Sequence, residues 1–264
     1  MLAPSIWLVG CGNMGGAMLR GWLAAGIAPS DILIIDPMAK NLPKDIRIVA
    51  KAEGAAPDIL LLGIKPQLLE EVAPSLTIGA NTIVISILAG VERAVLAAKL
   101  PGARDYVRVM PNMPAAIGEG ISAVFAPTLE AADRARVESL VAPLGAVEWI
   151  DDEALFHAVT GVSGSGPAFV LRFIDAMAAA GVSAGLEQGL ALRLALQTVA
   201  GTARLAQSTG ADPADLAEMV RSPNGTTHAG LTVMDASDLA AILMQTVNAA
   251  TQRSREMAEA ARNA

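Results

Sequence analysis

The sequence predicts a Rossmann-like, doubly wound α/β domain over residues 1–152, followed by an all-helical domain over residues 153–264. Three observations predict this fold class. Short apolar runs alternate with helical patterns in the first half, a glycine-rich turn follows the first run, and strand signals stop after about residue 151. The 264 residues, 53% of them hydrophobic and 17% charged, are enough for two packed cores.

Eight apolar runs predict the strands of an open sheet. Several lack the alternation of a half-exposed strand, which indicates a parallel sheet with helices on both faces. The strands are expected at residues 5–10, 31–36, 46–50, 58–65, 82–90, 106–111, 121–127 and 146–151. The helices between them are expected at about residues 13–25, 67–73, 91–100 and 129–142.

The first turn, "GCGNMGG", carries the pattern G-x-G-x-x-G at Gly10, Gly12 and Gly15. In a dinucleotide-binding fold these glycines permit a tight turn, the close approach of a pyrophosphate and the packing of helix on strand. The pattern follows a strand, opens a helix and precedes an acid, Asp36, at the end of the next strand. This context predicts a dinucleotide site rather than a glycine turn without a ligand.

Asp36 bears on which dinucleotide is used. A carboxylate at this position accepts the ribose hydroxyls of NAD, and its charge repels the 2′-phosphate of NADP. Asp36 can instead simply cap the turn before Pro37, and Lys40 lies close enough in sequence to pair with a phosphate. The choice between NADH and NADPH therefore stays open.

The second half combines long helical patterns with few acid–base groups. The absence of lysine from Asp151 to Ala264 argues against the β-hydroxyacid dehydrogenases, which rely on a lysine in their helical domain. We interpret His157 as a half-buried packing residue and His228 as a solvated residue in the first turn of a helix. No cluster of metal ligands is visible in the sequence. We expect a reaction that takes few protons from the protein and no metal. The helices are expected at about residues 167–181, 186–209, 213–221 and 237–262.

Two turns rich in glycine and serine stand out at expected helix starts, at residues 160–169 and 221–230. In the second, Ser222, Gly225, Thr226 and Thr227 can offer backbone amides and hydroxyls to a carboxylate. Turn chemistry alone favours ordinary N-capped turns in both places.

Composition restricts the partners. The net charge of −7 argues against a nucleic-acid partner. The single cysteine, Cys11, excludes an intrachain disulfide framework and fits a reducing compartment. The N-terminus lacks a signal-peptide pattern and no apolar run is expected to span a membrane, so we expect a cytoplasmic protein. Abundant small residues in the second half favour interlocking helices from two subunits.

Five motifs occur in an order that resembles the pyrroline-5-carboxylate reductase family over essentially the whole chain. They are "GCGNMG", "GIKP" at 63–66, "VRVMPNMPAAIGEG" at 107–120, "AVTGVSGSGPAFV" at 158–170 and "VRSPNGTTHAGL" at 220–231. The resemblance implies a Rossmann domain followed by a helical dimerisation domain, in a homodimer that assembles further, for example into a decamer. It implies NADPH or NADH as cofactor and hydride transfer to a cyclic imino acid, giving L-proline.

The resemblance also assigns residues. It implies that Thr227 hydrogen-bonds the ring nitrogen as the catalytic residue, beside Gly225 and Thr226 at the substrate carboxylate. The rest of the substrate pocket would come from Val162, Ser163 and Ser165. On the cofactor side, beyond the three glycines and Asp36, it implies Asn13, Met14, Ile64, Lys65, Pro66, Ala89, Gly90 and Asn112.

Three features depart from the family pattern. Asn224 stands where glycine is usual, but asparagine tolerates the left-handed backbone. The segment from Asp36 to Ile46 is short and proline-rich, so we expect a short or missing helix there. Asp36 itself replaces the small or polar residues typical near the 2′-phosphate. Two alternatives remain, namely a reductase of a related cyclic imino acid such as a piperideine carboxylate, and a non-catalytic dinucleotide-binding protein.

Overall fold

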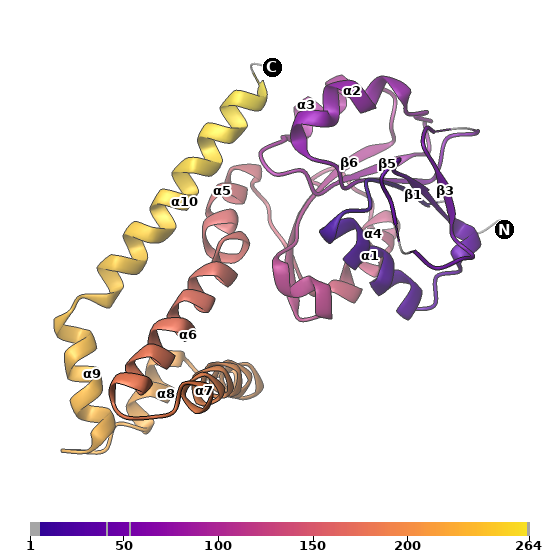
Figure 1. Cartoon of the computed structure of the whole chain (residues 1–264). Coiled ribbons are helices and arrows are strands. Elements are labelled where there is room, and N and C mark those ends of the chain that lie inside the picture. Colours follow the sequence, from indigo (N-terminus) through magenta and orange to yellow (C-terminus); the bar gives the residue numbers. More distant parts are fainter. Residues whose placement is uncertain (1–5, 41, 53, 263–264) are drawn as a thin grey trace. The chain divides into compact units, whose positions relative to one another are not determined.

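The computed structural model describes residues 6–40, 42–52 and 54–262 (Figure 1). The chain forms two compact units. The sheet unit comprises Met1–Ser165 and Asn248–Ala264, and the helical unit comprises Gly166–Val247. Residues 153–165 and the end of the last helix thus belong with the sheet by their contacts. The boundary predicted at residues 152 and 153 stays a prediction.

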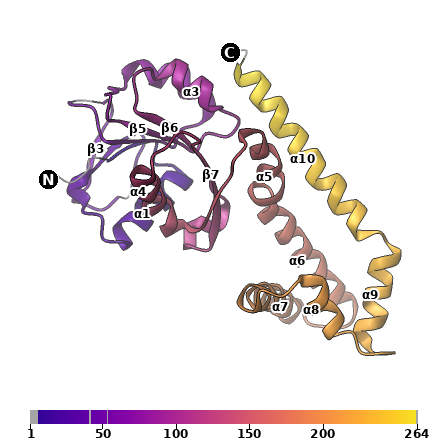
Figure 2. The same cartoon turned by 180° about the vertical axis from the view of Figure 1, so that it is seen from behind.

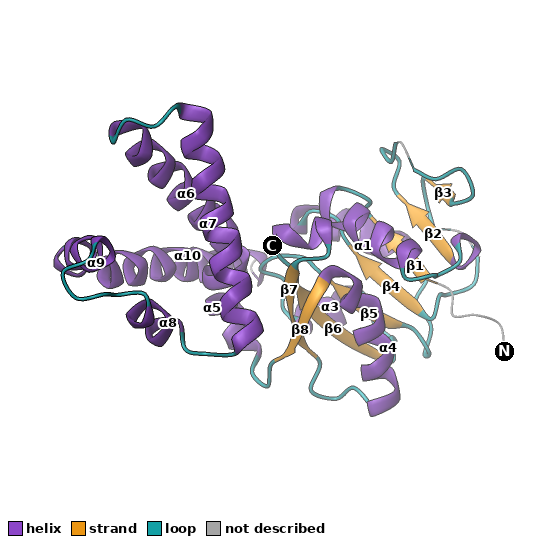
Figure 3. Cartoon of the chain, turned by 90° about the horizontal axis from the view of Figure 1, so that it is seen from below, coloured by secondary structure: helices purple, strands orange, loops and turns teal. Residues whose placement is uncertain are grey.

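An eight-stranded sheet forms the centre of the sheet unit, in the order β3-β2-β1-β4-β5-β6-β7-β8 (Figure 3). Neighbouring strands are parallel except β6 and β7, which are antiparallel. This order confirms the predicted doubly wound fold, because the chain reverses its direction of travel across the sheet between β3 and β4. The strands are Ile6–Val9, Ile32–Ile35, Arg47–Val49, Ile59–Leu62, Ile83–Ser86, Asp105–Met110, Gly120–Phe125 and Gly145–Trp149.

Helices cover both faces of the sheet, as the continuous apolar runs predict. On one face α1 (Asn13–Ala24) and α4 (Ala131–Val141) pack on the strands, and on the other α2 (Leu69–Val72) and α3 (Arg93–Lys99) do so (Figures 1 and 2). The fully buried Trp22 of α1 donates its indole N–H to the carbonyl oxygen of Leu140 over 2.7 Å, which ties α1 to α4.

The connection from β2 to β3 holds no helix in its described residues, 36–40 and 42–46, as the short segment predicts. The residue after β2, Asp36, lies directly beside the glycine-rich turn, where its carboxylate accepts the Cys11 amide.

The stretch at residues 160–169 is not the turn that the sequence predicts. A continuous helix runs from Glu153 to Ser183, through α5 (Phe156–Val159), a π-helical turn (Thr160–Gly164) and α6 (Gly166–Ser183). The amide of Ser165 donates to the carbonyl oxygen of Thr160 over 2.8 Å, which is the i→i+5 bond of a π-turn. The glycines are therefore absorbed into helix, and Pro167 lies inside it rather than at a free helix start.

This helix also corrects the expectation about membrane spans. By length and composition, Glu153–Ser183 is long and apolar enough to cross a membrane, and only 11% of its most apolar window is buried. A helix face this apolar and exposed is equally what a subunit interface presents.

The helical unit buries little of its own apolar surface. It contains α6, α7 (Gln188–Thr209), α8 (Pro213–Met219), α9 (Thr226–Ala236) and the first part of α10 (Leu239–Arg262). Exposed large apolar side chains occur on each of these helices, among them Phe173, Leu194, Met219, Val233 and Ile242. A single copy of this unit therefore presents a surface that another apolar surface must cover.

The end of α10 packs against the sheet unit near the β5–α3 connection (Figures 1 and 2). Gly90 has a φ of 76°, and a Cβ there would lie 3.4 Å from the backbone nitrogen of Ala258, which is buried. His157 contacts the same helix, with 3.0 Å between its Nδ1 and the Ser254 hydroxyl. Position 90 thus favours glycine through its left-handed backbone, and α10 packs at ordinary contact distance beside it.

The His157 contact predicts how stability depends on pH. Burial lowers the pKa of His157, the charges of Arg108, Arg255 and Arg262 lower it further, and Glu92 opposes them. The unfolded chain therefore takes up a proton at higher pH than the folded chain. The stabilisation is complete above the ordinary histidine pKa of about 6.5 and is lost as pH falls below it.

We therefore expect the free energy of unfolding to fall more steeply between about pH 8 and about pH 5.5 in the native protein than in His157→Gln, which keeps a polar partner for Ser254. Urea unfolding at one fixed protein concentration measures both slopes. Equal slopes would contradict the assignment.

Candidate functional site

One edge of the sheet gathers every residue predicted to bind the cofactor. Strands β1, β2, β4, β5 and β6 run parallel, so their carboxyl ends meet at this edge. The glycine-rich turn follows β1 and Asp36 follows β2. The other predicted residues follow β4, β5 and β6, and they are Ile64, Lys65, Pro66, Ala89, Gly90 and Asn112.

Backbone segments touch each other within the glycine-rich turn. Gly10 has a φ of 89°, and a Cβ there would lie 2.9 Å from the carbonyl carbon of Gly63. A Cβ on Gly15 would overlap the carbonyl oxygen of Gly10. The spacing of the motif therefore reflects a crossing of the turn, the start of α1 and the end of β4 that admits no side chain.

Gly12 differs from these two glycines because it faces open space. It is exposed, and no described atom lies within 4 Å of the position of a Cβ. It precedes α1, whose first residues are Asn13 and Met14, and no side chain among the described residues caps this helix start. Unpaired amides and the positive end of the helix dipole suit an anion here, so the residues present fit a dinucleotide pyrophosphate.

Backbone amides donate hydrogen bonds to both carboxylate oxygens of Asp36. Its Oδ2 accepts the amide of Cys11, inside the glycine-rich turn, over 2.8 Å, and its Oδ1 accepts the amide of Met38 over 2.7 Å. The second bond caps the turn before Pro37, which is one of the two roles that the sequence suggests for Asp36. The first places the carboxylate against the cofactor turn, and lone pairs remain on both oxygens for ribose hydroxyls.

The thiol of Cys11 lies in this same turn. Burial raises its pKa, the Asp36 carboxylate adds to the effect, and Arg20 opposes it. A protonated thiol next to Asp36 adds no second negative charge to the site.

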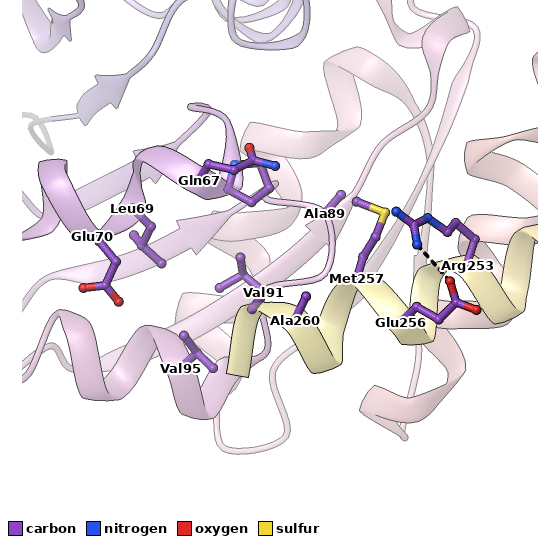
Figure 4. A pocket seen from close by; sticks show the side chains of 12 residues that line it. Gln67, Leu69, Glu70, Ala89, Val91, Val95, Arg253, Glu256, Met257 and Ala260 are labelled. Carbon is purple, nitrogen blue, oxygen red and sulfur yellow. Dashed lines mark hydrogen bonds and ion pairs between the residues drawn. The ribbon is translucent and has the colours of Figure 1, made fainter. Parts of the chain in front are cut away.

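The segments after β4 and β5 border a cavity of about 440 Å³ (Figure 4). Pro66 and Ala89 contribute to its wall, and the facing wall comes from the end of α10, where Met257 lies beside Ala89. Lys65 is exposed at the same edge of the sheet. Two of the predicted cofactor residues thus line a real hollow in the sheet unit.

Asn112 follows β6 and braces the next strand. Its side-chain oxygen accepts the amide of Ile121 over 3.0 Å. The side-chain amide nitrogen is then the group that Asn112 offers to a ligand.

The π-turn contains the first group of predicted substrate residues. Val162 is 63% exposed, while Ser163 donates its hydroxyl to the carbonyl oxygen of Val159 over 3.0 Å. Ser165 closes the π-turn and is half-buried. π-Turns inside α-helices are frequent at functional sites, since they shift the side chains that follow.

The second group lies in the helical unit, at the start of α9. Asn224 has a φ of 56°, which confirms that it takes the left-handed backbone expected of it. The Gly225 amide donates to the carbonyl oxygen of Ser222 over 2.9 Å, and a Cβ on Gly225 would overlap the Ser222 hydroxyl.

Thr226 and Thr227 then open α9, whose start carries no side-chain cap from the described residues. The turn leaves helix-start amides available to a carboxylate.

Sequence reasoning missed a cluster of charged residues. Arg93, Asp105, Arg108 and Glu153 form ion pairs that join α3, β6 and the start of the helix at 153. They are far apart in sequence and follow no motif, so only the fold brings them together.

Comparisons with known proteins match both halves of the chain. The family model described as pyrroline-5-carboxylate reductase dimerisation matches residues 153–257, and one described as NADP oxidoreductase, coenzyme F420-dependent, matches residues 5–90. The pyrroline-5-carboxylate reductase of Pseudomonas aeruginosa is 38% identical over 98% of each chain. That of Synechocystis is 39% identical over 97% of this chain and 99% of the relative.

Solved structures agree. A pyrroline-5-carboxylate reductase from Coxiella burnetii superposes with a TM-score of 0.85 at 27% identity, covering 96% of this chain and 98% of that one. The Plasmodium falciparum pyrroline carboxylate reductase with NADP bound gives 0.82 at 26% identity, covering 98% and 99%. With its doubly wound sheet, its glycine-rich turn and its matched dimerisation region, this chain belongs to the pyrroline-5-carboxylate reductase family.

Proposed function

We propose that this chain catalyses the NAD(P)H-dependent reduction of 1-pyrroline-5-carboxylate to L-proline. One observation carries the proposal. The same chain holds an open helix start at a dinucleotide turn and a second open helix start at "SPNGTT", within a family match that covers 98% of its length. The first suits a pyrophosphate and the second a substrate carboxylate.

The chemistry needs little acid–base help from the protein. The cyclic imine can be protonated in solution, and a bound NAD(P)H would supply a hydride to its imine carbon, the atom that becomes C5 of proline. The protein's task is to hold the imino acid in one orientation and to stabilise its charge distribution. The small need for acid–base groups agrees with the second half of the chain, which has no lysine. Its two histidines are hydrogen-bonded to other side chains, His157 to Ser254 and His228 to Arg221.

Each of the two substrate segments has a separate role in the proposal. The amides of Thr226 and Thr227 at the start of α9 hold the carboxylate, with Gly225 beside it leaving room for its approach. The Thr227 hydroxyl hydrogen-bonds the ring nitrogen as the catalytic residue. The π-turn residues Val162, Ser163 and Ser165 form a further wall. Open amides at α9 and the exposed side chain of Val162 support these roles.

On the cofactor side we propose that Gly10–Gly15 cradle the pyrophosphate and that Ile64, Lys65, Pro66, Ala89, Gly90 and Asn112 border the remainder. Asp36 gives this chain a usable NADH site, because its carboxylate is fixed against the turn by the Cys11 amide. A fixed negative charge binds ribose hydroxyls and opposes a 2′-phosphate.

We propose that the protein is a homodimer formed through residues 153–257, and that dimers assemble into a decamer. The exposed apolar side chains of α6, α7 and α10 support burial against a second subunit, which would also account for the membrane-compatible composition of the helix at 153–183. On this proposal the protein acts in the cytoplasm, without a membrane or a nucleic acid as partner.

Purified protein mixed with 1-pyrroline-5-carboxylate is expected to oxidise NADH or NADPH. The loss of absorbance of the reduced cofactor measures the rate. A piperideine carboxylate measured in parallel reports ring size. Turnover of the six-membered ring alone would favour the alternative imino-acid reductase. Turnover with neither ring and neither cofactor would leave only the non-catalytic dinucleotide-binding protein.

Asp36→Ser is expected to lower the ratio of kcat/KM for NADH to that for NADPH by about tenfold or more, since it removes one charge beside the ribose. Asp45→Ser, at an exposed acid of the same connection, is the matched control and should leave the ratio unchanged. An unchanged ratio in Asp36→Ser would mean that Asp36 serves only as the turn cap.

Thr227→Ala is expected to lower kcat/KM for the imino acid by about tenfold or more, as one hydrogen bond is lost in a desolvated site. The control is Thr232→Ala on the same helix, where the hydroxyl donates to the His228 carbonyl oxygen. Wild-type kinetics in Thr227→Ala would remove this hydroxyl from the mechanism.

A further inference from the structure

A partly buried ion pair joins the middle of the sheet to the start of the long helix. Arg108 lies on β6 with its side chain 7% exposed, and its guanidinium lies 2.7 Å from Glu153 Oε1. The same guanidinium lies over the ring of Phe156, 4.3 Å from the ring centre. One side chain thus holds two successive points of the helix, by an ion pair and by a cation–π contact.

Glu153 carries a third connection. Its Oε1 also accepts the backbone amide of Arg93, the first residue of α3, over 2.7 Å. The Arg93 side chain bonds Asp105, Thr128 and the carbonyl oxygen of Tyr106. The helix start at residue 153 is therefore fixed to β6 and to α3 at once.

A second contact on the same strand lies at the π-turn. Met110 is two residues beyond Arg108, so both side chains leave β6 on the same face. A Cβ on Gly164 would lie 2.8 Å from Cε of Met110, which means that the last residue of the π-turn packs closely on this side chain. The first part of the long helix, residues 153–164, thus contacts strand β6 both at its start and at the π-turn.

The π-turn lies between these two attachments. A π-turn takes one more residue than an α-turn and is rare in proteins, so we expect it to persist where the surroundings hold it. Fixing Glu153 and Phe156 on one side and Gly164 on the other sets the direction in which Val162, Ser163 and Ser165 point.

We propose that Arg108 and Glu153 are positioning residues, which hold the π-turn Thr160–Gly164 and Ser165 in register on β6 and thereby orient the imino acid without touching it. This inference rests on the proposed function. It gives a reason for a charged pair at a partly buried place, since ion pairs removed from water contribute little net stability compared with apolar side chains of similar size. The planar guanidinium can pair with a carboxylate and stack on a ring at once, which lysine cannot do as well.

The test compares two conservative variants, Glu153→Gln and Arg108→Lys, with Arg104→Gln as the matched control. Arg104 also forms ion pairs in the sheet unit, with Glu130 and Asp133, but none with the long helix. In the first two variants we expect KM for the imino acid to rise by about tenfold, with the Kd for the cofactor unchanged. In the control we expect a lower melting temperature and unchanged kinetics.

A readout that needs no turnover accompanies the kinetics. Amide hydrogen exchange at Gly161–Ser165 is expected to be about tenfold faster or more in Glu153→Gln and Arg108→Lys than in Arg104→Gln, because the anchor of the π-turn is loosened. If the native protein reduces no imino acid, the proposed function fails, and the exchange rates still decide whether the pair holds the π-turn.

The double variant Arg108→Met, Glu153→Leu distinguishes a positioning role of the ion pair from a role in stability alone. It replaces the pair by apolar side chains and should keep the melting temperature near that of the native protein while KM stays raised. Native KM in this double variant, or a lower melting temperature with native KM and native exchange in the single variants, would overturn the proposal.

Discussion

The crossing of backbones at the end of β1 is the constraint on which the rest of the site depends. The turn at Gly10, the start of α1 at Gly15 and the end of β4 at Gly63 approach so closely that a Cβ on any of the three would collide with backbone atoms. This packing brings the uncapped amides of α1 to the edge where the parallel strands end. Asp36 and the segments after β4 and β5 then lie around a position that an anion can occupy.

The fold was largely predictable because its signals are local. Continuous apolar runs at β1, β4 and β5 and the glycine spacing specify a doubly wound sheet without reference to distant residues. The left-handed backbone at Asn224 followed from a single residue, and the absence of a helix from the described residues after β2 followed from segment length. Such features depend on the chain's own stereochemistry, so the sequence alone reveals them.

Other features depend on partners that are distant in the sequence. "GVSGSG" has the composition of a turn, yet Met110 and the Arg108–Glu153 pair hold it in a π-helical form inside a long helix. The contact of Gly90 with Ala258 of α10 is similar, since the two residues are far apart in the sequence and only the fold brings them together. Composition also cannot predict that the apolar helix at 153–183 is exposed, because the same composition fits a buried helix, a membrane span or a subunit interface.

In the proposed reaction a hydride passes from a nicotinamide directly to the imine carbon of a substrate held by its carboxylate. The most direct measurement supplies a cofactor carrying deuterium in place of both hydrogens at nicotinamide C4, and analyses the proline formed by mass spectrometry. Direct hydride transfer is expected to place one deuterium in each proline, at C5. Proline formed without deuterium would contradict it, because the hydrogen at C5 would then come from solvent or from another donor.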